Sequence, residues 1–277
     1  MNIVSHNNQK KIALVNDFTG FGRCSIAVQL PLISALKVQC CPLPTAVFSN
    51  HTGFESFVSR DLTDDMVPWM QEWKKLDLRF DAILTGFLNS AEQIALISRF
   101  IDMFRDERTV TIIDPVMGDH GKRYRTYTPE MCDRMKSLCE KADLLTPNLT
   151  EACLLTDTAY RDDMPRDEAE QIARKLIEQG CKKAVITGIV EGNCITNLCL
   201  EEGAEPEYVT VTRLGNERSG TGDLFSAILA AETVRGASLL SSVKKASEFI
   251  KRCIQRAIDM DIPLTDGVPF EELLTEI

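Results

Sequence analysis

The segment Arg218–Ala230 combines two glycines and a carboxylate at the point where a loop runs into an apolar helix. Because Gly220 and Gly222 have no Cβ, backbone N–H groups can approach a phosphate closely there, and the positive end of a helix starting near Thr221 attracts its charge. Asp223 would repel that phosphate, which indicates that it acts on a neutral hydroxyl, as a general base that activates an alcohol. We therefore expect Gly220, Thr221, Gly222 and Asp223 to be catalytic.

The same four residues are also compatible with a simple turn and helix cap, since Asp favours the first helical turn. The residues that follow, Leu224–Ala231, are almost all apolar. A helix with such a dense apolar face is buried, and its N-terminus then points inward. The burial favours the phosphate-binding function, although the four residues alone leave both interpretations open.

Two further carboxylates follow short apolar runs. Asp114 comes directly after residues 109–113, and Glu151 comes shortly after residues 143–146. Both could hold Mg²⁺ directly or through water, because that ion takes few protein carboxylates and keeps several waters. Asn148 and Glu151 have the spacing of a capping box, so capping of a helix that begins near Leu149 is the alternative for them. Pro115 forces an extended backbone at Asp114 and does not suit a cap there.

Two N-terminal segments carry polar groups that could contact a substrate. Residues 16–24 follow the first apolar run and lack the Gly-x-Gly-x-x-Gly spacing of a dinucleotide site. Asp17 could contact a polar substrate there or be an ordinary turn residue. Residues 48–54 concentrate aromatic, hydroxyl, amide and imidazole groups, which suits an aromatic ring substrate. A β-turn containing an ordinary hydrogen-bonded His51 is the alternative.

The elements that must position these residues alternate along the chain. Near-continuous apolar strands are predicted at 11–15, 81–85, 109–113, 143–146 and 184–187, and helices at 24–37, 63–76, 90–106, 128–141, 165–180, 222–235 and 238–260. Such strands are typical of a parallel sheet covered on both faces, so we predict a doubly wound α/β fold. Residues 193–203 and 208–212 predict an antiparallel edge hairpin. Ligands bind beyond the carboxyl ends of the strands in such folds.

Composition limits the other possibilities. The 277 residues are 44% hydrophobic and show no linker, which predicts one domain over residues 1–277. The net charge of −10 argues against a nucleic-acid or anionic membrane surface and favours a small-molecule ligand. Residues 1–10 contain no apolar signal core, so we expect a cytoplasmic protein. The ten cysteines are scattered through apolar stretches, and we expect reduced, mostly buried thiols.

Taken together, these segments resemble the ribokinase-like family of small-molecule kinases over nearly the whole chain, and within it the pyridoxal kinases. Residues 218–225, 114–119 and 146–151 are similar to the family's catalytic-base, metal and nucleotide segments. Residues 48–54 and 84–87, with Ser90-Ala-Glu, are similar to the vitamin-binding segments of the pyridoxal kinases.

The resemblance implies a role for each matching residue. Asp223 would take the proton of a 5′-hydroxymethyl group, and the amides of Gly220 to Gly222 would steady the transferring phosphoryl group. Thr52 and Gly53 would contact the ring. Mg²⁺ and ATP would be served by Asp114, Asn148 and Glu151, with Tyr127, Thr187 and Thr221 near the nucleotide. A monovalent cation often assists in this family and its enzymes are usually homodimers, so the resemblance also implies K⁺ and a homodimer.

The chain departs from the pyridoxal kinases at two positions. Asp17-Phe18 stands where they usually carry Ser-His, and Phe87 stands where Tyr is common. A carboxylate against the ring favours a protonated ring nitrogen or an amino substituent, so the substrate preference could move toward pyridoxamine or an aminopyrimidine. We count Asp17 and Phe87 among the substrate-binding residues.

The expected function is ATP-dependent phosphorylation of a B6 vitamer, namely pyridoxal, pyridoxine or pyridoxamine. A hydroxymethylpyrimidine kinase of the same superfamily is the nearest alternative, although some bifunctional kinases of that type carry Cys where this chain has Asp223. A binding protein without chemistry is the third possibility, and retention of Asp223 argues against it.

Overall fold

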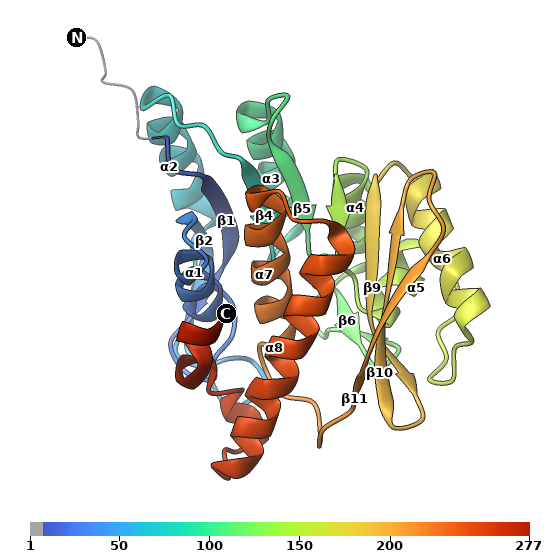
Figure 1. Cartoon of the computed structure of the whole chain (residues 1–277). Helices are drawn as coiled ribbons and strands as arrows, with labels where there is room; N and C mark the ends of the chain where they lie inside the picture. The colour runs from blue at the N-terminus through green and yellow to red at the C-terminus, as the bar shows by residue number, and fades with distance from the viewer. Residues whose placement is uncertain (1–7) are drawn as a thin grey trace.

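A computed structural model describes residues 8–277 of the chain, so most of the segment assessed above for a signal lies outside the described residues. Within residues 8–277, nine strands form one sheet in the order β11-β10-β9-β8-β5-β4-β1-β2-β3. The central pairs, from β2 through β1, β4, β5 and β8 to β9, are parallel, and the outer pairs at both edges are antiparallel. This is the predicted mostly parallel α/β sheet (Figure 1).

The strands of this sheet are β1 (Lys11–Thr19), β2 (Gln39–Phe48), β3 (Ser59–Asp61), β4 (Ala82–Thr85), β5 (Val110–Ile113), β8 (Leu144–Leu145), β9 (Lys183–Glu191), β10 (Cys194–Glu201) and β11 (Glu207–Thr212). A separate small hairpin joins β6 (Gly118–Asp119) to β7 (Lys122–Arg123). The helices are α1 (Ile26–Ala35), α2 (Thr63–Lys75), α3 (Ala91–Phe104), α4 (Pro129–Cys139), α5 (Leu149–Leu155), α6 (Arg166–Glu178), α7 (Thr221–Arg235) and α8 (Leu239–Asp259). Short 3-10 turns at Leu264–Asp266 and Phe270–Glu276 follow α8.

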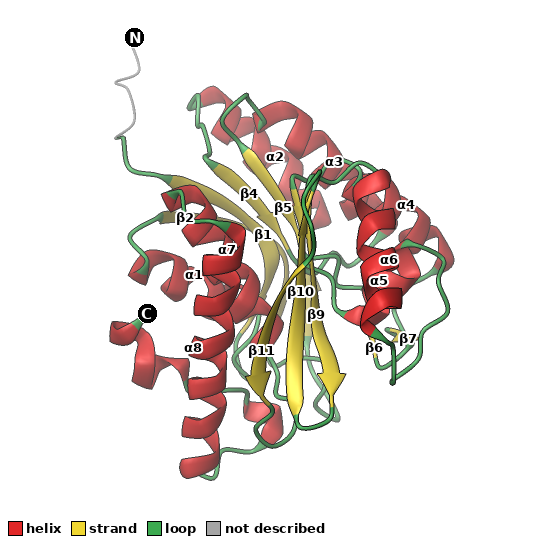
Figure 2. Ribbon diagram, turned by 45° about the vertical axis from the view of Figure 1, so that its right-hand side comes forward, coloured by secondary structure: helices red, strands yellow, loops and turns green. Residues whose placement is uncertain are grey.

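Helices cover both faces of the sheet, as Figure 2 shows. One apolar core packs α1, α7 and α8 against one face, and a second core packs α2 to α6 against the other. The central strands are short, apolar and buried on both sides, β4 and β5 almost completely. The helix α7 is buried along nearly its whole length, so its N-terminus points into the molecule, as its apolar face predicts.

The predicted edge hairpin is confirmed, because β10 and β11 pair antiparallel at one end of the sheet. β2 is a strand that the apolar runs did not predict. It contains Pro42 and Pro44, which cannot donate a backbone hydrogen bond, but β3 pairs only with residues 46–48 of β2. The two prolines therefore occupy a part of β2 that is paired on one side only, where a missing N–H is tolerated.

Two smaller expectations concern the cysteines and the membrane. All ten cysteines, which lie within residues 8–277, carry free thiols, and six of them are buried. The prediction that most of these thiols are buried is confirmed. None of the helices in the described part of the chain combines the length and the apolarity that crossing a bilayer requires.

Candidate active site

A large cavity of about 1410 Å³ opens beyond the carboxyl ends of the parallel strands. Segments that follow β1, β4, β5 and β8 reach it together with the C-terminal part of β9, because parallel strands that run in one direction end at the same edge of the sheet. The sequence-predicted residues that line this cavity are Asp17, Thr52, Gly53, Phe87, Asp114, Asn148, Glu151, Thr187, Gly220, Thr221, Gly222 and Asp223.

Tyr127 is the exception among the sequence-predicted site residues. Its ring packs in the apolar core between α4 and the sheet, it is 4% exposed, and it does not line the cavity. Tyr124, three residues earlier, does line the cavity. Both tyrosines have polar neighbours on each side, arginines at Tyr124 and threonines at Tyr127, so the direction in which the loop turns decides which of them faces the site.

The predicted phosphate-binding loop, residues 218–222, is formed by a close approach of two chain segments. Gly220 precedes α7 in the left-handed conformation with a φ of 79°, and a Cβ on it would lie 1.9 Å from the carbonyl oxygen of Arg23. Glycine is required there for both reasons. A Cβ on Gly222 would meet no atom within 4 Å, so the first turn of α7 presents bare backbone to the cavity. The free N–H groups of that turn, with the helix dipole, form an anion site.

Asp223 lies in the first turn of α7 and faces the same space. Its Oδ2 accepts a hydrogen bond from the backbone N–H of Ser25 at 2.7 Å, and its Oδ1 accepts one from Asn16 Nδ2 at 3.1 Å. Burial raises the pKa of this carboxyl to about 7, with the charge of Asp17 adding to the increase. An aspartate with such a pKa can take a proton from a hydroxyl near neutral pH, which an ordinary aspartate does poorly.

Asn16 is a site residue that sequence reasoning did not single out. Besides Asp223, its amide group donates to Gln29 Oε1 and accepts from the backbone N–H of Asp17 and of Phe87. A Cβ on Gly86 would overlap the Asn16 side chain at 2.4 Å, so a glycine after β4 makes room for this network. A buried amide directly after an apolar strand was the available signal, but apart from Asp17 its partners lie 13 to 207 positions away.

Asn16 and Asp17 are neighbours in β1 and yet both reach the cavity. Successive side chains of a regular strand point to opposite faces. The pairing of β1 with β2 shifts register between Asn16 and Phe18, and such an irregularity re-aims side chains. β1 also continues to Thr19, four residues beyond the predicted strand, so these two residues belong to a strand and not to a turn.

Asp114 and Glu151 are two further carboxylates that line the cavity. Asp114 is 9% exposed and Glu151 is 3% exposed. Burial raises the pKa of Asp114 well above its usual range, with further contributions from the charges of Glu151 and Asp223. Burial also raises the pKa of Glu151, to about 7, although backbone N–H groups oppose the increase. Asp114 and Glu151 offer carboxylate oxygens, which are the ligands that a divalent ion such as Mg²⁺ prefers.

The capping alternative for Asn148 and Glu151 is present in full. Asn148 accepts from the N–H of Glu151, and Glu151 Oε2 accepts from the N–H of Asn148, which forms a capping box at the start of α5. Glu151 Oε1 accepts from the N–H of Met117 at 3.0 Å. Both carboxylate oxygens therefore hold backbone groups, and Glu151 would serve a metal ion through a bridging water more readily than directly.

We expect Glu151→Gln to raise the Mg²⁺ concentration that half-maximal activity requires, because an amide carries no charge toward the metal. Gln has only one side-chain oxygen that can accept a hydrogen bond, so it cannot hold the N–H groups of both Met117 and Asn148 as the carboxylate does. The loss of one of these bonds should also lower the free energy of unfolding by about 0.5–2 kcal/mol. Activity titrated with Mg²⁺ and thermal unfolding separate the two effects. A metal titration superimposable on that of the parent protein would leave Glu151 a purely structural role.

Aromatic rings form another part of the cavity lining. The ring centroid of Phe48 lies 5.7 Å from that of Phe57 and 6.2 Å from that of Phe87. His51 packs on Phe54 at 4.6 Å, and its ring nitrogens contact the N–H of Gly53 and the carbonyl oxygen of Thr265. The segment 48–57 is thus packed together and tied to the C-terminal turns, and its aromatic side chains suit contact with a ring substrate.

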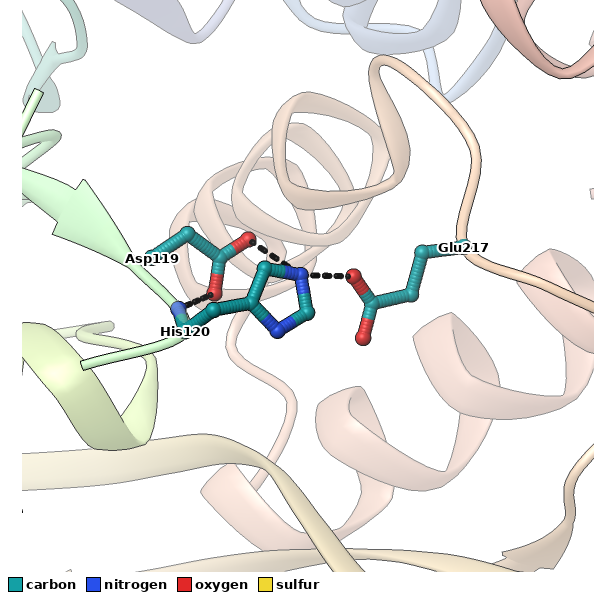
Figure 3. Close-up of side chains that lie close together, drawn as sticks. All are labelled: Asp119, His120 and Glu217. Carbon is teal, nitrogen blue, oxygen red and sulfur yellow. Dashed lines mark hydrogen bonds and ion pairs between the residues drawn. The ribbon is translucent and has the colours of Figure 1, made fainter. Parts of the chain in front are cut away.

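Asp119, His120 and Glu217 lie together at the exposed mouth of the cavity (Figure 3). His120 Nε2 lies 2.8 Å from Glu217 Oε2 and 3.9 Å from Asp119 Oδ2. The contact joins the β6–β7 hairpin to the loop that precedes α7, two segments that are far apart in the sequence. The sequence assigned no role to His120, because its partner can be identified only once the fold brings the two loops together.

Comparison with known proteins agrees with this geometry. Residues 26–264 match the family model of phosphomethylpyrimidine kinase. A pyridoxine/pyridoxal/pyridoxamine kinase of Bordetella avium is 34% identical over 248 residues, which cover 84% of this chain and 81% of the relative. A hydroxymethylpyrimidine/phosphomethylpyrimidine kinase of Haemophilus influenzae is 31% identical over 192 residues, covering 67% of this chain and 69% of the relative.

A solved structure is similar over almost the entire chain. It is a protein of Bacteroides thetaiotaomicron assigned as a phosphomethylpyrimidine kinase and crystallised with pyridoxal. The TM-score is 0.93 at 37% identity, and the match covers 97% of this chain and 96% of the other. The family match, the relatives and this fold lead to one conclusion. The chain belongs to the phosphomethylpyrimidine kinase family, which has a ribokinase-like fold, and pyridoxal kinases are among the proteins to which the chain is similar.

Proposed function

We propose that this protein transfers the γ-phosphoryl group of ATP to the 5′-hydroxymethyl group of a B6 vitamer. The observation that carries the proposal is the position of Asp223 among the glycine amides at the start of α7, with its pKa raised by burial to about 7. A base and an anion site that share one turn of helix can serve both ends of a phosphoryl transfer. The pyridoxal in the similar Bacteroides structure and the name of the Bordetella relative support the choice of vitamer.

The chain's own residues divide the work as follows. Asp223 takes the proton of the attacking hydroxyl, and the N–H groups of the first turn of α7 stabilise the charge on the transferring phosphoryl group. Thr52, Gly53 and Phe87 line the part of the cavity that would hold the ring, beside the aromatic side chains of the segment 48–57. Asn148, Thr187 and Thr221 line the same cavity and would face the nucleotide.

Asp114 and Glu151 would hold Mg²⁺, directly or through water. When bound, the ion would neutralise charge on the nucleotide phosphates, and its charge would also relieve the mutual repulsion of Asp114, Glu151 and Asp223.

The use of K⁺, assembly as a homodimer and a cytoplasmic location belong to the same proposal and rest on the resemblance to the family. Light scattering of the purified protein tests the homodimer directly.

One experiment tests the reaction and the substrate together. The protein is incubated with ATP and Mg²⁺ and, separately, with pyridoxal, pyridoxine, pyridoxamine and hydroxymethylpyrimidine, and the products are identified by mass spectrometry. We expect phosphorylation of at least one B6 vitamer. Efficient phosphorylation of the pyrimidine with none of any vitamer would overturn the proposal in favour of a thiamine-pathway kinase.

The pyrimidine kinase remains the second candidate because the matching family model carries that description. Asp17 is the residue that bears on it, since a buried carboxylate beside the ring position could accept a hydrogen bond from an amino substituent. An amino group is present in pyridoxamine and in an aminopyrimidine and absent from pyridoxine. The ratio of kcat/KM values for pyridoxamine and pyridoxine measures this preference.

The pH dependence of the reaction follows from the same carboxyl group. Asp223 acts as a base only when ionised, and burial raises its pKa from the usual range to about 7. We therefore expect kcat to increase with pH through a midpoint near 7 and to level off above it, measured between pH 5.5 and 9 at saturating ATP and Mg²⁺. A profile that is already flat at pH 5.5 would show that the base is not a buried carboxyl.

A further inference from the structure

The segment between β1 and α1 holds two residues in an unfavourable backbone conformation. Arg23 has a φ of 48°, and Ser25 has a φ of 57° with a ψ of −144°. The conformation of Ser25 is close to a region that is essentially restricted to glycine, and a residue with a side chain persists there only when its surroundings hold it. Such strain tends to occur at functional sites. A serine in place of glycine at position 25 therefore indicates that its side chain has a specific role.

The contacts of Ser25 show what that role is. Ser25 occupies the N-cap position of α1, but its side chain makes no capping hydrogen bond. Its hydroxyl instead donates to Asp17 Oδ1 at 2.7 Å, while its backbone N–H donates to Asp223 Oδ2, also at 2.7 Å. One residue thus joins the two carboxylates, with its side chain on the first and its backbone on the second.

Asp17 is buried, and within residues 8–277 the one cationic group whose charge acts on it is His51, which lowers its pKa. Asp17 is 5% exposed, and its second oxygen accepts from the hydroxyl of Thr19 at 2.7 Å. None of the ion pairs found among residues 8–277 includes Asp17. Two hydroxyl donors favour the ionised form of this carboxyl, although burial raises its pKa. Both oxygens are occupied within the protein, which limits what Asp17 can offer to a ligand.

The strained segment is also clamped from outside. The guanidinium group of Arg23 donates to the carboxylate of Glu271 and to the carbonyl oxygen of Asp266. The carbonyl oxygen of Arg23 is the atom that leaves no room for a Cβ on Gly220. The segment 23–25 is therefore held between the C-terminal turns and the phosphate-binding loop, so that its N–H groups have little freedom to move.

We propose that Asp17 and Ser25 are positioning residues for the base: the Asp17 carboxylate fixes the Ser25 hydroxyl, and this holds the Ser25 N–H on Oδ2 of Asp223 and so fixes the orientation of that carboxylate at the cavity. The proposal rests on the proposed function and deepens it, because it names what sets the orientation and the proton affinity of the base. Neither residue needs to touch the substrate to act in this way.

Asp17 also acts on Asp223 through its charge. Of the groups that face Asp223, Asp17 raises its pKa, and the N–H of Ser25 and the amide of Asn16 lower it. Asp114 from the end of β5, Tyr124 from the loop after β7 and Cys24 from the strained segment each feel the charge of Asp223 in turn. Removal of the Asp17 charge should therefore lower the pKa of the base, while removal of its hydrogen bond should disturb the orientation of the base.

The test compares Asp17→Asn with the matched control Thr19→Val, since each removes a hydrogen bond of the Asp17 carboxylate but only the first affects the link to Asp223. For Asp17→Asn we expect kcat on the alkaline plateau to fall roughly tenfold, and the midpoint of the acidic limb to move to lower pH by about one unit. For Thr19→Val we expect kcat and the midpoint to stay within about twofold and ~0.2 unit of the parent values.

Two outcomes would overturn the proposal. A raised KM with kcat and the acidic limb unchanged would make Asp17 a substrate contact instead. A lower plateau with an unmoved midpoint in both variants would reduce the network to general structural support. Ser25→Gly sharpens the test, because glycine accepts the backbone conformation and retains the N–H but lacks the hydroxyl. We expect it to fold and to lose about as much kcat as Asp17→Asn.

A second measurement separates this proposal from the proposed function. The Asp223 carboxyl is titrated by ¹³C NMR in protein with labelled aspartate, and its signal is assigned by its loss in Asp223→Asn. A lower midpoint in Asp17→Asn but not in Thr19→Val supports the link even if no substrate is turned over. Equal titration midpoints of Asp223 in the parent protein, Asp17→Asn and Thr19→Val contradict the proposal, whatever the assay of activity shows.

Discussion

Replacing Asp223 with Asn should lower kcat by roughly 10²–10⁴ while the substrates still bind, in line with the contribution of a general base. Asn preserves the shape of the side chain and can still accept from the N–H of Ser25, so the loss measures proton transfer and not collapse of the site. Steady-state kinetics with the preferred vitamer measure kcat, and calorimetry measures the affinity for the substrate. An unchanged kcat would remove Asp223 from the role of base.

The same substitution should change stability in a direction that depends on pH. The folded-state pKa of Asp223, about 7, lies above the usual value for an aspartate, so the folded protein binds this proton more tightly than the unfolded chain. The stability that this group contributes is present below the unfolded pKa and is lost as the pH rises to about 7. The melting temperature of Asp223→Asn minus that of the parent protein should therefore be larger at pH 8 than at pH 5.

A surface substitution is the control for both measurements. Asp102 forms an exposed ion pair with Lys141 far from the cavity, so Asp102→Asn removes one carboxylate without touching the site. Pairs of this kind contribute about 0–1 kcal/mol, and we expect neither kcat nor the pH dependence of unfolding to change measurably. If Asp102→Asn matched Asp223→Asn in its effect on kcat, the loss would reflect net charge and not the base.

Alanine substitutions at the two glycines of the predicted phosphate-binding loop should differ in their effect on stability, although both should lower activity. Gly220→Ala places a methyl group 1.9 Å from a backbone oxygen at a φ of 79°, which no small side-chain shift relieves. We expect a loss of more than about 2 kcal/mol of unfolding free energy, seen as a fall of roughly 4–8 °C in melting temperature. Activity should fall as well, because the loop and the segment 23–25 can no longer meet.

Gly222→Ala meets no atom within 4 Å and adds a better helix former to the first turn of α7. Stability should stay the same or rise by up to about 1 kcal/mol. The new methyl group occupies the space through which a phosphoryl group reaches the backbone N–H groups, so we expect kcat/KM to fall roughly 10–10³-fold. Thermal unfolding and kinetics of both variants form one experiment, and a fully active Gly222→Ala protein would contradict an anion site at this helix end.

Local sequence carried much of the architecture. The buried parallel strands, the edge hairpin and the seven long helices follow from apolar periodicity, which depends on a few neighbouring residues. The capping box of Asn148 and Glu151 and the glycines before α7 are also local signals, because caps and turns are made within four positions. β2 was missed because its two prolines disguise a strand that is only partly paired.

The sequence by itself thus determined the α/β class, the glycine-containing turn that begins α7 and the set of strand ends from which the candidate site is built. The tertiary structure alone decided that Asn16 and Ser25 hold Asp223, that His120 meets Glu217, and that Tyr127 packs in the core while Tyr124 lines the cavity. The physical reason is separation: these partners lie about 100 to 207 positions apart or depend on the turn of one loop. Hydrogen bonds act over about 3 Å, so only the folded chain selects which distant polar groups become partners.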